Sequence, residues 1–505
     1  MSGMVYLVGA GPGDPGLVTA RGLELIKKAD CIIYDRLSAP ELLDYARADC
    51  EQIYVGKADQ HHTLPQEEIN ALLVEKARLL SNVVRLKGGD VYVFGRGGEE
   101  GIYLAEHGIA FTVVPGVSSA IAGAAYAGIP VTHRGIATAF RVITAHNRKD
   151  QTTEMDFASM RDDQETLIFL MGLSKVGEIA DGLMEAGRTG NTPVAVISHA
   201  TTPAQKVCVG SLDTIAQKVS VQQLTSPAMI VVGEVVRLRE TLNVFEKMPL
   251  FGKKYLVPKI GSEPSRLAER LRAKGAAVTE CMVGEIVGIP ARYTRQELSQ
   301  VDILLFTSQN GVEYFMRNLF ASGLDVRILS HAGLVVIGQK TAQKLREYGL
   351  CADFIPEKFD SDALLSELKQ YMKQLHADDP FRRLVTWYPT AKNAKDELVD
   401  GLLEVCDCGR LNVYDNVVCE PKINGTPASI NDEELISYDG IFFTCASSAE
   451  RLLGGKNLEF LQQLGVHTSI YSIGPKCSRA LGSLGITPVI EAGVHTYEGL
   501  LRLIL

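Results

Sequence analysis

Short apolar runs alternate with longer amphipathic stretches along the first half of the chain. The run at residues 4–9 ends at a glycine, and residues 17–28 then carry apolar positions at helical spacing. Short apolar runs predict buried strands, whereas apolar positions three and four apart predict helices. Strands that alternate with helices are typical of an α/β fold. The same pattern predicts further strands at residues 31–34, 83–86, 111–114, 141–144, 166–171, 194–197 and 229–232.

A weakly patterned stretch at residues 243–254 separates this half from the rest of the chain. It contains Pro249 and Gly252, which interrupt helices and strands. We therefore expect one domain at residues 1–245 and a second at 246–505. Pro115-Gly116 and the small residues after it predict a hinge that divides the first domain into lobes of about 1–115 and 116–245.

The second half repeats itself. Phe306-Thr307-Ser308 is followed by Ile337-Gly338, and Phe443-Thr444-Cys445 is followed in the same way by Ile473-Gly474. Two copies of one α/β unit predict two similar lobes that face a cleft. Chance similarity between α/β elements is the alternative.

Length, charge and cysteine usage narrow the class of protein. A chain of 505 residues is too long for one core, and a formal net charge of -9 argues against a nucleic-acid binder. No apolar run reaches ~18 residues and no signal region opens the chain, so we expect a cytoplasmic protein without a membrane span. The ten cysteines show no CxxC spacing. Cys406 and Cys408 lie two apart, which favours buried thiols on one strand face over a metal site, and no metal is expected.

The first glycine-rich segment is Gly9-Ala10-Gly11-Pro12-Gly13-Asp14-Pro15, directly after the first predicted strand. A dinucleotide fingerprint needs a third glycine where Asp14 stands, and no GxxxxGK[ST] loop exists, so we expect no NAD. Its prolines and glycines predict a rigid turn that lets backbone approach a ligand closely. A plain strand-to-helix turn explains it about as well.

A second segment, residues 85–100, places five glycines in one loop after a strand, where ligands of α/β folds bind. Gly88 and Gly89 let backbone face a ligand, and Asp90 suits a ribose or an ammonium group. Lys87 and Arg96 suit carboxylates. In a third segment, after residue 114, Ser118 offers a hydroxyl, and His133 is either a ligand contact or a packed core histidine.

In order and register, residues 4–245 resemble the uroporphyrinogen-III C-methyltransferases, a branch of the tetrapyrrole methylases. The segments that carry the resemblance are VGAGPGDPG, YDRL, VGK, PQEEIN, RLKGGD, FGRGGEE, VPGVSSA, AGIPVTHR and MGL. It implies two α/β lobes with S-adenosylmethionine between them, S-adenosylhomocysteine as product, and a homodimer. The positions implied to contact the methyl donor are Pro12, Gly88, Gly89, Asp90, Val93, Ser118, Ser119, Met171 and Ala200.

The resemblance also implies roles in methyl transfer. Asp35 matches the proposed proton acceptor and Lys57 the proposed proton donor, although Asp35 as an ordinary helix cap remains open. A base near the ring is chemically reasonable, because methylation of a pyrrole carbon requires loss of a proton. Arg96, His133 and Arg134 are expected to bind a tetrapyrrole polycarboxylate. Three family positions differ: Val91-Tyr92 replaces Pro-Phe, Leu170 replaces an aromatic residue and Ala200 replaces a glycine.

From about Gly252 the chain resembles uroporphyrinogen-III synthase, which closes linear hydroxymethylbilane. This resemblance implies two flavodoxin-like lobes joined by two strands, lobe one at 252–287 plus 419–505 and lobe two at 288–418. Lys259 and Lys395 stand where the family often has arginine, and no catalytic residue is expected. Hydroxyls, amides at helix starts and lysines suit a ligand with many carboxylates. The candidate substrate contacts are Thr307, Ser308, Lys340, Thr341, Thr444 and Lys476.

Together these resemblances predict a bifunctional enzyme that makes uroporphyrinogen III and methylates it at carbons 2 and 7 to precorrin-2. The alternatives are a methyltransferase with a degenerate C-terminal half, and a methylase of another tetrapyrrole or of a modified protein. A tetrapyrrole-binding regulator without turnover is a further alternative of a different class. The choice between siroheme and cobalamin biosynthesis stays open.

Overall fold

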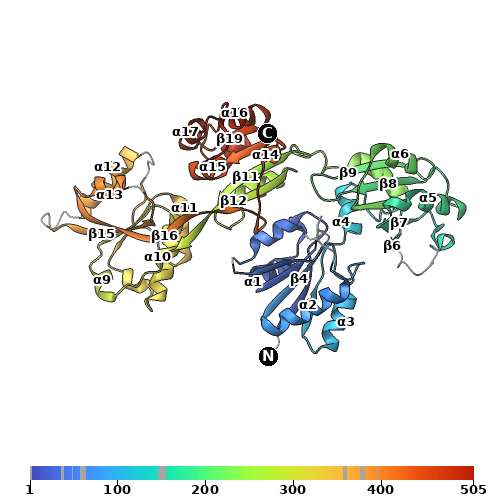
Figure 1. The fold of residues 1–505 in the computed structure, drawn as a ribbon, viewed down its shortest axis with the longest axis horizontal. Coiled ribbons are helices and arrows are strands. Elements are labelled where there is room, and N and C mark those ends of the chain that lie inside the picture. Colours follow the sequence, from blue (N-terminus) through green and yellow to red (C-terminus); the bar gives the residue numbers. More distant parts are fainter. Residues whose placement is uncertain are drawn as a thin grey trace. The chain divides into compact units, whose positions relative to one another are not determined.

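The computed structural model describes residues 3–35, 39–47, 49–56, 64–145, 155–356, 361–375, 382–394 and 396–505. The chain forms two compact units, one of Met1–Met282 with Pro421–Leu505 and one of Val283–Glu420. Strands and helices alternate in both, so the predicted α/β class is confirmed (Figure 1). Within the described ranges, no helix combines the length and the apolar character that a membrane crossing needs.

The first sheet of the larger unit is fully parallel and has the order β3-β2-β4-β1-β5. Gly9 lies opposite Lys87 and Tyr34 opposite Leu86. The carboxyl ends of β1, β2 and β4 therefore meet at one edge, and the loops after them gather there. The strands are β1 (Met4–Gly9), β2 (Cys31–Tyr34), β3 (Glu51–Tyr54), β4 (Asn82–Lys87) and β5 (Phe111–Val114).

Three α-helices accompany this sheet: α1 (Ala20–Lys28), α2 (Gln66–Leu79) and α3 (Gly97–Glu106). The helix predicted from residue 17 begins only at Ala20. Pro15 starts a separate short 3-10 turn, and Thr19 caps α1 by accepting a hydrogen bond from the Gly22 amide at 3.1 Å. Apolar spacing alone does not reveal such a cap.

The second sheet has the order β6-β7-β10-β8-β9 and is mixed. β6 and β7 are parallel, whereas β10 runs antiparallel to both β7 and β8, and β8 antiparallel to β9. Its strands are β6 (Ala139–Thr144), β7 (Glu165–Leu170), β8 (Pro193–Ser198), β9 (Lys206–Ser211) and β10 (Ala228–Val232); its helices are α4 (Ser119–Tyr126), α5 (Val176–Glu185) and α6 (Ile215–Gln222).

The third sheet of the larger unit contains β11 (Lys254–Ile260), β18 (Gly440–Phe443), β19 (Ser469–Ser472) and β20 (Ile490–Glu491), which are parallel neighbours in this order. Aromatic side chains contribute to its core, where Tyr255 packs edge to face against Phe442, and Phe442 stacks on Tyr471. The helices are α8 (Arg266–Arg272), α14 (Asp432–Ile436), α15 (Ala446–Leu453), α16 (Leu458–His467), α17 (Pro475–Ser483) and α18 (Tyr497–Leu501).

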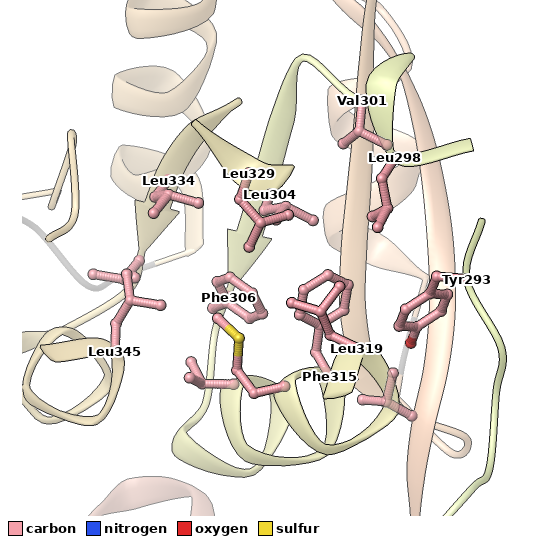
Figure 2. Close-up of a cluster of buried hydrophobic side chains, with 14 of the residues drawn as sticks. Tyr293, Leu298, Val301, Leu304, Phe306, Phe315, Leu319, Leu329, Leu334 and Leu345 are labelled. Carbon is pink, nitrogen blue, oxygen red and sulfur yellow. The ribbon is translucent and has the colours of Figure 1, made fainter. Parts of the chain in front are cut away.

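The smaller unit is built around the parallel strands β14-β13-β15-β16. Figure 2 shows its core, in which Phe306 of β13 and Phe315 of α10 pack edge to face with ring centroids 5.6 Å apart. β12 (Ala277–Gly288) and β16 (Cys406–Ile423) carry the chain into and out of this unit, and Cys406 and Cys408 are both buried on one face of β16, as predicted. The other elements are β13 (Ile303–Phe306), β14 (Gly333–Val336), β15 (Leu384–Ala391), α9 (Arg295–Ser299), α10 (Gln309–Ala321), α11 (Gln339–Glu347), α12 (Ser361–Leu375) and α13 (Glu397–Leu402).

The repeat in the second half has a direct structural counterpart. β13 pairs with β14 over four residues in parallel, and β18 pairs with β19 over four residues in the same way. Each strand leads into a helix: α10 follows β13, and α15 follows β18. One copy lies in each compact unit.

Candidate methylase and synthase sites

Four glycines bring the loops after β1, β4 and β5 into direct contact. Gly11 and Gly89 exchange backbone hydrogen bonds of 3.2 and 2.7 Å. A Cβ on Gly116 would lie 2.2 Å from the Gly89 carbonyl oxygen, and one on Gly9 would lie 2.5 Å from Gly116 Cα. Because no side chain fits between these loops, glycine is required where they cross.

The Asp90 carboxylate ties the same loops together. Its Oδ1 accepts hydrogen bonds from the Tyr92 and Val93 amides at 2.8 and 3.1 Å, and its Oδ2 accepts one from the Gly116 amide at 3.0 Å. Bonds to a charged acceptor are stronger than neutral ones. Asp90 therefore shapes the loop that contains Gly89 and Val93.

Left-handed backbone is concentrated in this region. Among the described residues, seven non-glycine residues have a positive φ, and five of them lie in loops of the first two sheets that contain or adjoin predicted donor contacts. Such conformations cost free energy and collect where a ligand is held. The five are Phe94, Arg96, Met171, His199 and Thr201.

The predicted donor contacts lie on loops that follow strands of the first and second sheets. Ser118 caps α4 and accepts a hydrogen bond from the Ala120 amide, so Ser118 and Ser119 start that helix. The Asp14 amide donates to Thr201 Oγ1 at 3.2 Å, which brings the turn around Pro12 against the loop that contains Ala200. Met171 follows β7 and is half exposed. The Gly88–Asp90 segment follows β4.

Asp35 lies at the carboxyl end of β2 and contacts a buried arginine. Arg85 Nη2 donates to Asp35 Oδ2 at 3.2 Å, and Arg85 Nε contacts Glu100 Oε1 at the same distance. The next described helical turn, Pro40–Tyr45, has Ala39 and not Asp35 as its N-cap residue. Lys57 lies outside the described residues.

Lys87 does not reach a substrate carboxylate, because its side chain is buried and contacts Glu100 at 2.8 Å. Burial lowers the pKa of Lys87, neighbouring Arg85 adds to this effect, and Glu100 opposes it. The pattern of glycines and charges had suggested a carboxylate contact. The position of Lys87 within β4 explains the difference, since its side chain enters the core.

The three candidate substrate contacts of this half have different surroundings. Arg96 forms a two-point ion pair with Glu99, with distances of 3.0 and 2.7 Å. His133 is exposed, and its Nδ1 lies 2.9 Å from the Arg134 carbonyl oxygen, so the packed-core alternative for His133 is wrong. Arg134 is also exposed.

In the smaller unit, the hydroxyls after β13 bind two tyrosines that the sequence reasoning missed. Thr307 Oγ1 lies 3.1 Å from the Tyr388 hydroxyl, and Ser308 Oγ lies 3.2 Å from the Tyr414 hydroxyl. Ser308 also caps α10 by accepting from the Gly311 amide. Tyr388 lies on β15 and Tyr414 on β16, and the sheet brings their hydroxyls to the loop after β13. At the start of α11, Lys340 is exposed whereas Thr341 is buried.

The second copy of the repeat, in the larger unit, is less polar at the equivalent point. Thr444 is half-buried, and Cys445 takes the place of Ser308 at the start of α15 without a side-chain cap. Lys476 is exposed at the start of α17. Next to it, Ser478 donates to Ser472 Oγ at 3.0 Å.

Two family models match the chain, one in each half. The family model Tetrapyrrole (Corrin/Porphyrin) Methylases matches residues 4–216, and Uroporphyrinogen-III synthase HemD matches residues 265–502. The porphyrin biosynthesis protein HemD of Ruminiclostridium josui is 41% identical over 362 residues, which are 71% of this chain and 72% of that protein. Uroporphyrinogen-III C-methyltransferase of Bacillus subtilis (strain 168) is 42% identical over 350 residues, 69% of this chain and 72% of that protein.

A solved structure gives a further likeness. The uroporphyrin-III C-methyl transferase from Thermus thermophilus complexed with S-adenyl homocysteine is 38% identical, with a TM-score of 0.41, and the match covers 47% of this chain and 94% of that chain.

Fold and relatives together define a two-part α/β protein, a methylase followed by a synthase-like region. The chain belongs to the tetrapyrrole methylase family of uroporphyrinogen-III C-methyltransferases and HemD proteins, and carries a uroporphyrinogen-III synthase region after the methylase. The predicted enzyme class, a methyltransferase joined to a synthase of tetrapyrrole biosynthesis, is confirmed.

Proposed function

We propose that the chain transfers methyl groups from S-adenosylmethionine to carbons 2 and 7 of uroporphyrinogen III, which yields precorrin-2. The observation that carries this proposal is the crossing of the glycine loops beside Asp90, with strained backbone on both sides. A Cβ on Gly89 would find only the Ser119 amide within 4 Å, at 3.8 Å. This space, bordered by backbone amides, fits a ligand that backbone groups hold.

The proposed donor contacts are the nine positions named from the family resemblance. Gly88, Gly89 and the turn around Pro12 present backbone to the donor, and Asp90 keeps their loop in place. Ser118 and Ser119 supply the start of α4, and Val93, Met171 and Ala200 supply apolar surface. When bound, S-adenosylmethionine supplies a methyl group on a sulfonium sulfur.

Asp35 is the proposed proton acceptor. A new carbon–methyl bond on the macrocycle forms as the sulfur–methyl bond breaks, and the ring then carries one excess proton. The Asp35 carboxylate takes that proton, and its contact with Arg85 keeps it oriented. Lys57 is the proposed proton donor, and Arg96, His133 and Arg134 are the proposed contacts for ring carboxylates.

The C-terminal region is proposed to make the substrate by closing hydroxymethylbilane. Thr307, Ser308, Lys340 and Thr341 in the smaller unit, and Thr444 and Lys476 in the larger unit, are the proposed carboxylate contacts. Ring closure passes through a cationic species, which preorganised dipoles stabilise without a nucleophile. We further propose a cytoplasmic homodimer that associates through the methylase domain.

One experiment tests both activities. The full chain receives fresh hydroxymethylbilane and S-adenosylmethionine without oxygen, and products are resolved by absorbance and mass. A dimethylated type III product supports the whole proposal. Unmethylated type III alone overturns the methyltransferase, and type I products alone mean that the C-terminal region is a degenerate scaffold. Light scattering of the same sample tests the dimer.

A further inference from the structure

Three charged side chains are buried together behind Asp35. Glu100 is fully buried, and Arg85 and Lys87 are 3% and 4% exposed. Burial of charges is costly, and apolar residues of similar size often stabilise a core as well or better. The cluster therefore calls for an explanation other than stability.

Glu100 is the centre of this cluster. Its Oε1 accepts from Lys87 Nζ at 2.8 Å, from Arg85 Nε at 3.2 Å and from Gln66 Nε2 at 3.2 Å. Its Oε2 is buried and has no hydrogen-bond partner among the residues that the structure describes. An acceptor that is left unsatisfied in a core costs free energy, which again sets Glu100 apart from an ordinary structural residue.

Arg85 connects Glu100 to Asp35. Its Nη1 donates to the carbonyl oxygens of Ile33 and Leu86, and its Nη2 donates to Asp35 Oδ2. The guanidinium is thus held from several sides and presents one edge to Asp35. Lysine has one compact ammonium group and cannot reproduce this planar fork.

The cluster opens toward solvent at Asp35, whose side chain is 29% exposed. Tyr34 of β2 is paired with Leu86 of the parallel strand β4. Asp35 comes directly after Tyr34 and Lys87 directly after Leu86, so both residues lie at the carboxyl ends of neighbouring strands. The Gly88–Asp90 segment of the proposed donor site continues from Lys87. The exposed end of the cluster and the proposed donor loops therefore begin at the same sheet edge.

We propose that Glu100 is a positioning residue for methyl transfer, which acts through Arg85 to fix the carboxylate of Asp35 and which, with Lys87, balances the charge around it. This inference rests on the proposed role of Asp35. Two cations and two anions face one another, so removal of Glu100 leaves an excess of positive charge and removal of Lys87 leaves an excess of negative charge. Removal of both restores the balance.

The test compares the full chain with its Glu100→Gln, Lys87→Met and Glu100→Gln/Lys87→Met variants. Uroporphyrinogen III and S-adenosylmethionine are supplied without oxygen, and kcat, the KM for the tetrapyrrole and the Kd for S-adenosylmethionine are measured. We expect Glu100→Gln to lower kcat at least ~10-fold, with KM and Kd within about 2-fold, because proton transfer alone is affected. The double variant should regain most of the lost kcat.

A purely structural role would give another pattern. A double variant no faster than Glu100→Gln, or a loss confined to Kd, overturns the inference. Ring closure by the same chain serves as the folding control. If Glu100→Gln does not fold, Arg85→Lys replaces it, and unchanged kcat in that variant overturns the inference.

An Asp35→Asn variant separates the two levels of proposal. If the Asp35→Asn variant methylates at the wild-type rate, the inference and the proposed role of Asp35 are both overturned, while the methyltransferase function stands. Absence of any methylated product from the unaltered chain overturns the proposed function itself.

Discussion

The candidate sites of the methylase and synthase regions are held in different ways. In the methylase domain, the carboxyl groups of Asp90 and Glu100 each accept hydrogen bonds from several fixed donors, and the loops cross at glycines. In the synthase region, the candidate hydroxyls Thr307 and Ser308 bind tyrosine hydroxyls, and the candidate lysines are exposed.

This difference matches the two proposed reactions. Methyl transfer needs a donor, a ring carbon and a base in fixed relative positions, and small displacements lower the rate strongly. Ring closure of a flexible polycarboxylate depends more on the electrostatic field that many weak contacts produce together. Substitutions in the methylase loops should therefore have large and local effects, and single substitutions in the synthase region should have small ones.

The largest effect is expected for Asp90→Ala. Three backbone amides lose a charged acceptor, so the loop around Gly89 loses its shape, and methylation should fall ~100-fold or more. Ring closure should continue at the wild-type rate. Both rates are measured in one anaerobic sample by mass spectrometry. An equal fall in both activities would contradict the local role of Asp90.

The next largest effect is expected for Gly116→Ala. Its Cβ would lie 2.2 Å from the Gly89 carbonyl oxygen, so the loops must separate, at a cost of about 1–3 kcal/mol. The methylation rate should fall at least ~10-fold, and thermal unfolding should begin at a lower temperature. Gly98→Ala is the matched control, because a Cβ there meets nothing within 4 Å. Equal effects of the two substitutions would contradict the requirement for glycine at the crossing.

A smaller effect is expected for Ser308→Ala. The variant loses the cap of α10 and the contact with Tyr414, which should lower the free energy of unfolding by about 1 kcal/mol. Ring closure should slow several-fold, and methylation of supplied uroporphyrinogen III should not change. Cys445→Ala in the second copy is the control, since Cys445 makes no side-chain cap. Chemical denaturation measures both variants.

The smallest effects are expected for Lys340→Ala and Lys476→Ala. Each exposed lysine contributes weakly in water, so the KM for hydroxymethylbilane should rise only about 2- to 5-fold, and added salt should reduce the difference. Lys373→Ala on α12 is the control. A loss of methylation in either variant would contradict the prediction that the two regions carry out separate reactions.

Much of the fold could be predicted from local pattern. The strands β1, β2 and β5 match the apolar runs, and the repeat of β13 and β18 follows from similar segments. The spacing of apolar residues and the glycines at strand ends are local properties of the sequence, so they can be recognised without knowledge of the sheet order. Helix caps are harder to predict from the sequence, and for that reason the predicted start of α1 was wrong by three residues.

The candidate sites divide in the same way. The sequence by itself identified the glycine loops, Asp90 and Asp35 as candidate site residues, because the family motifs occur in order. Only the tertiary structure decided that Arg85 contacts Asp35 fifty positions away, that Lys87 turns inward to Glu100, and that Tyr414 meets Ser308. Such pairs depend on which strands are neighbours and which face each side chain takes, and the order of neighbours is a property of the packed sheet.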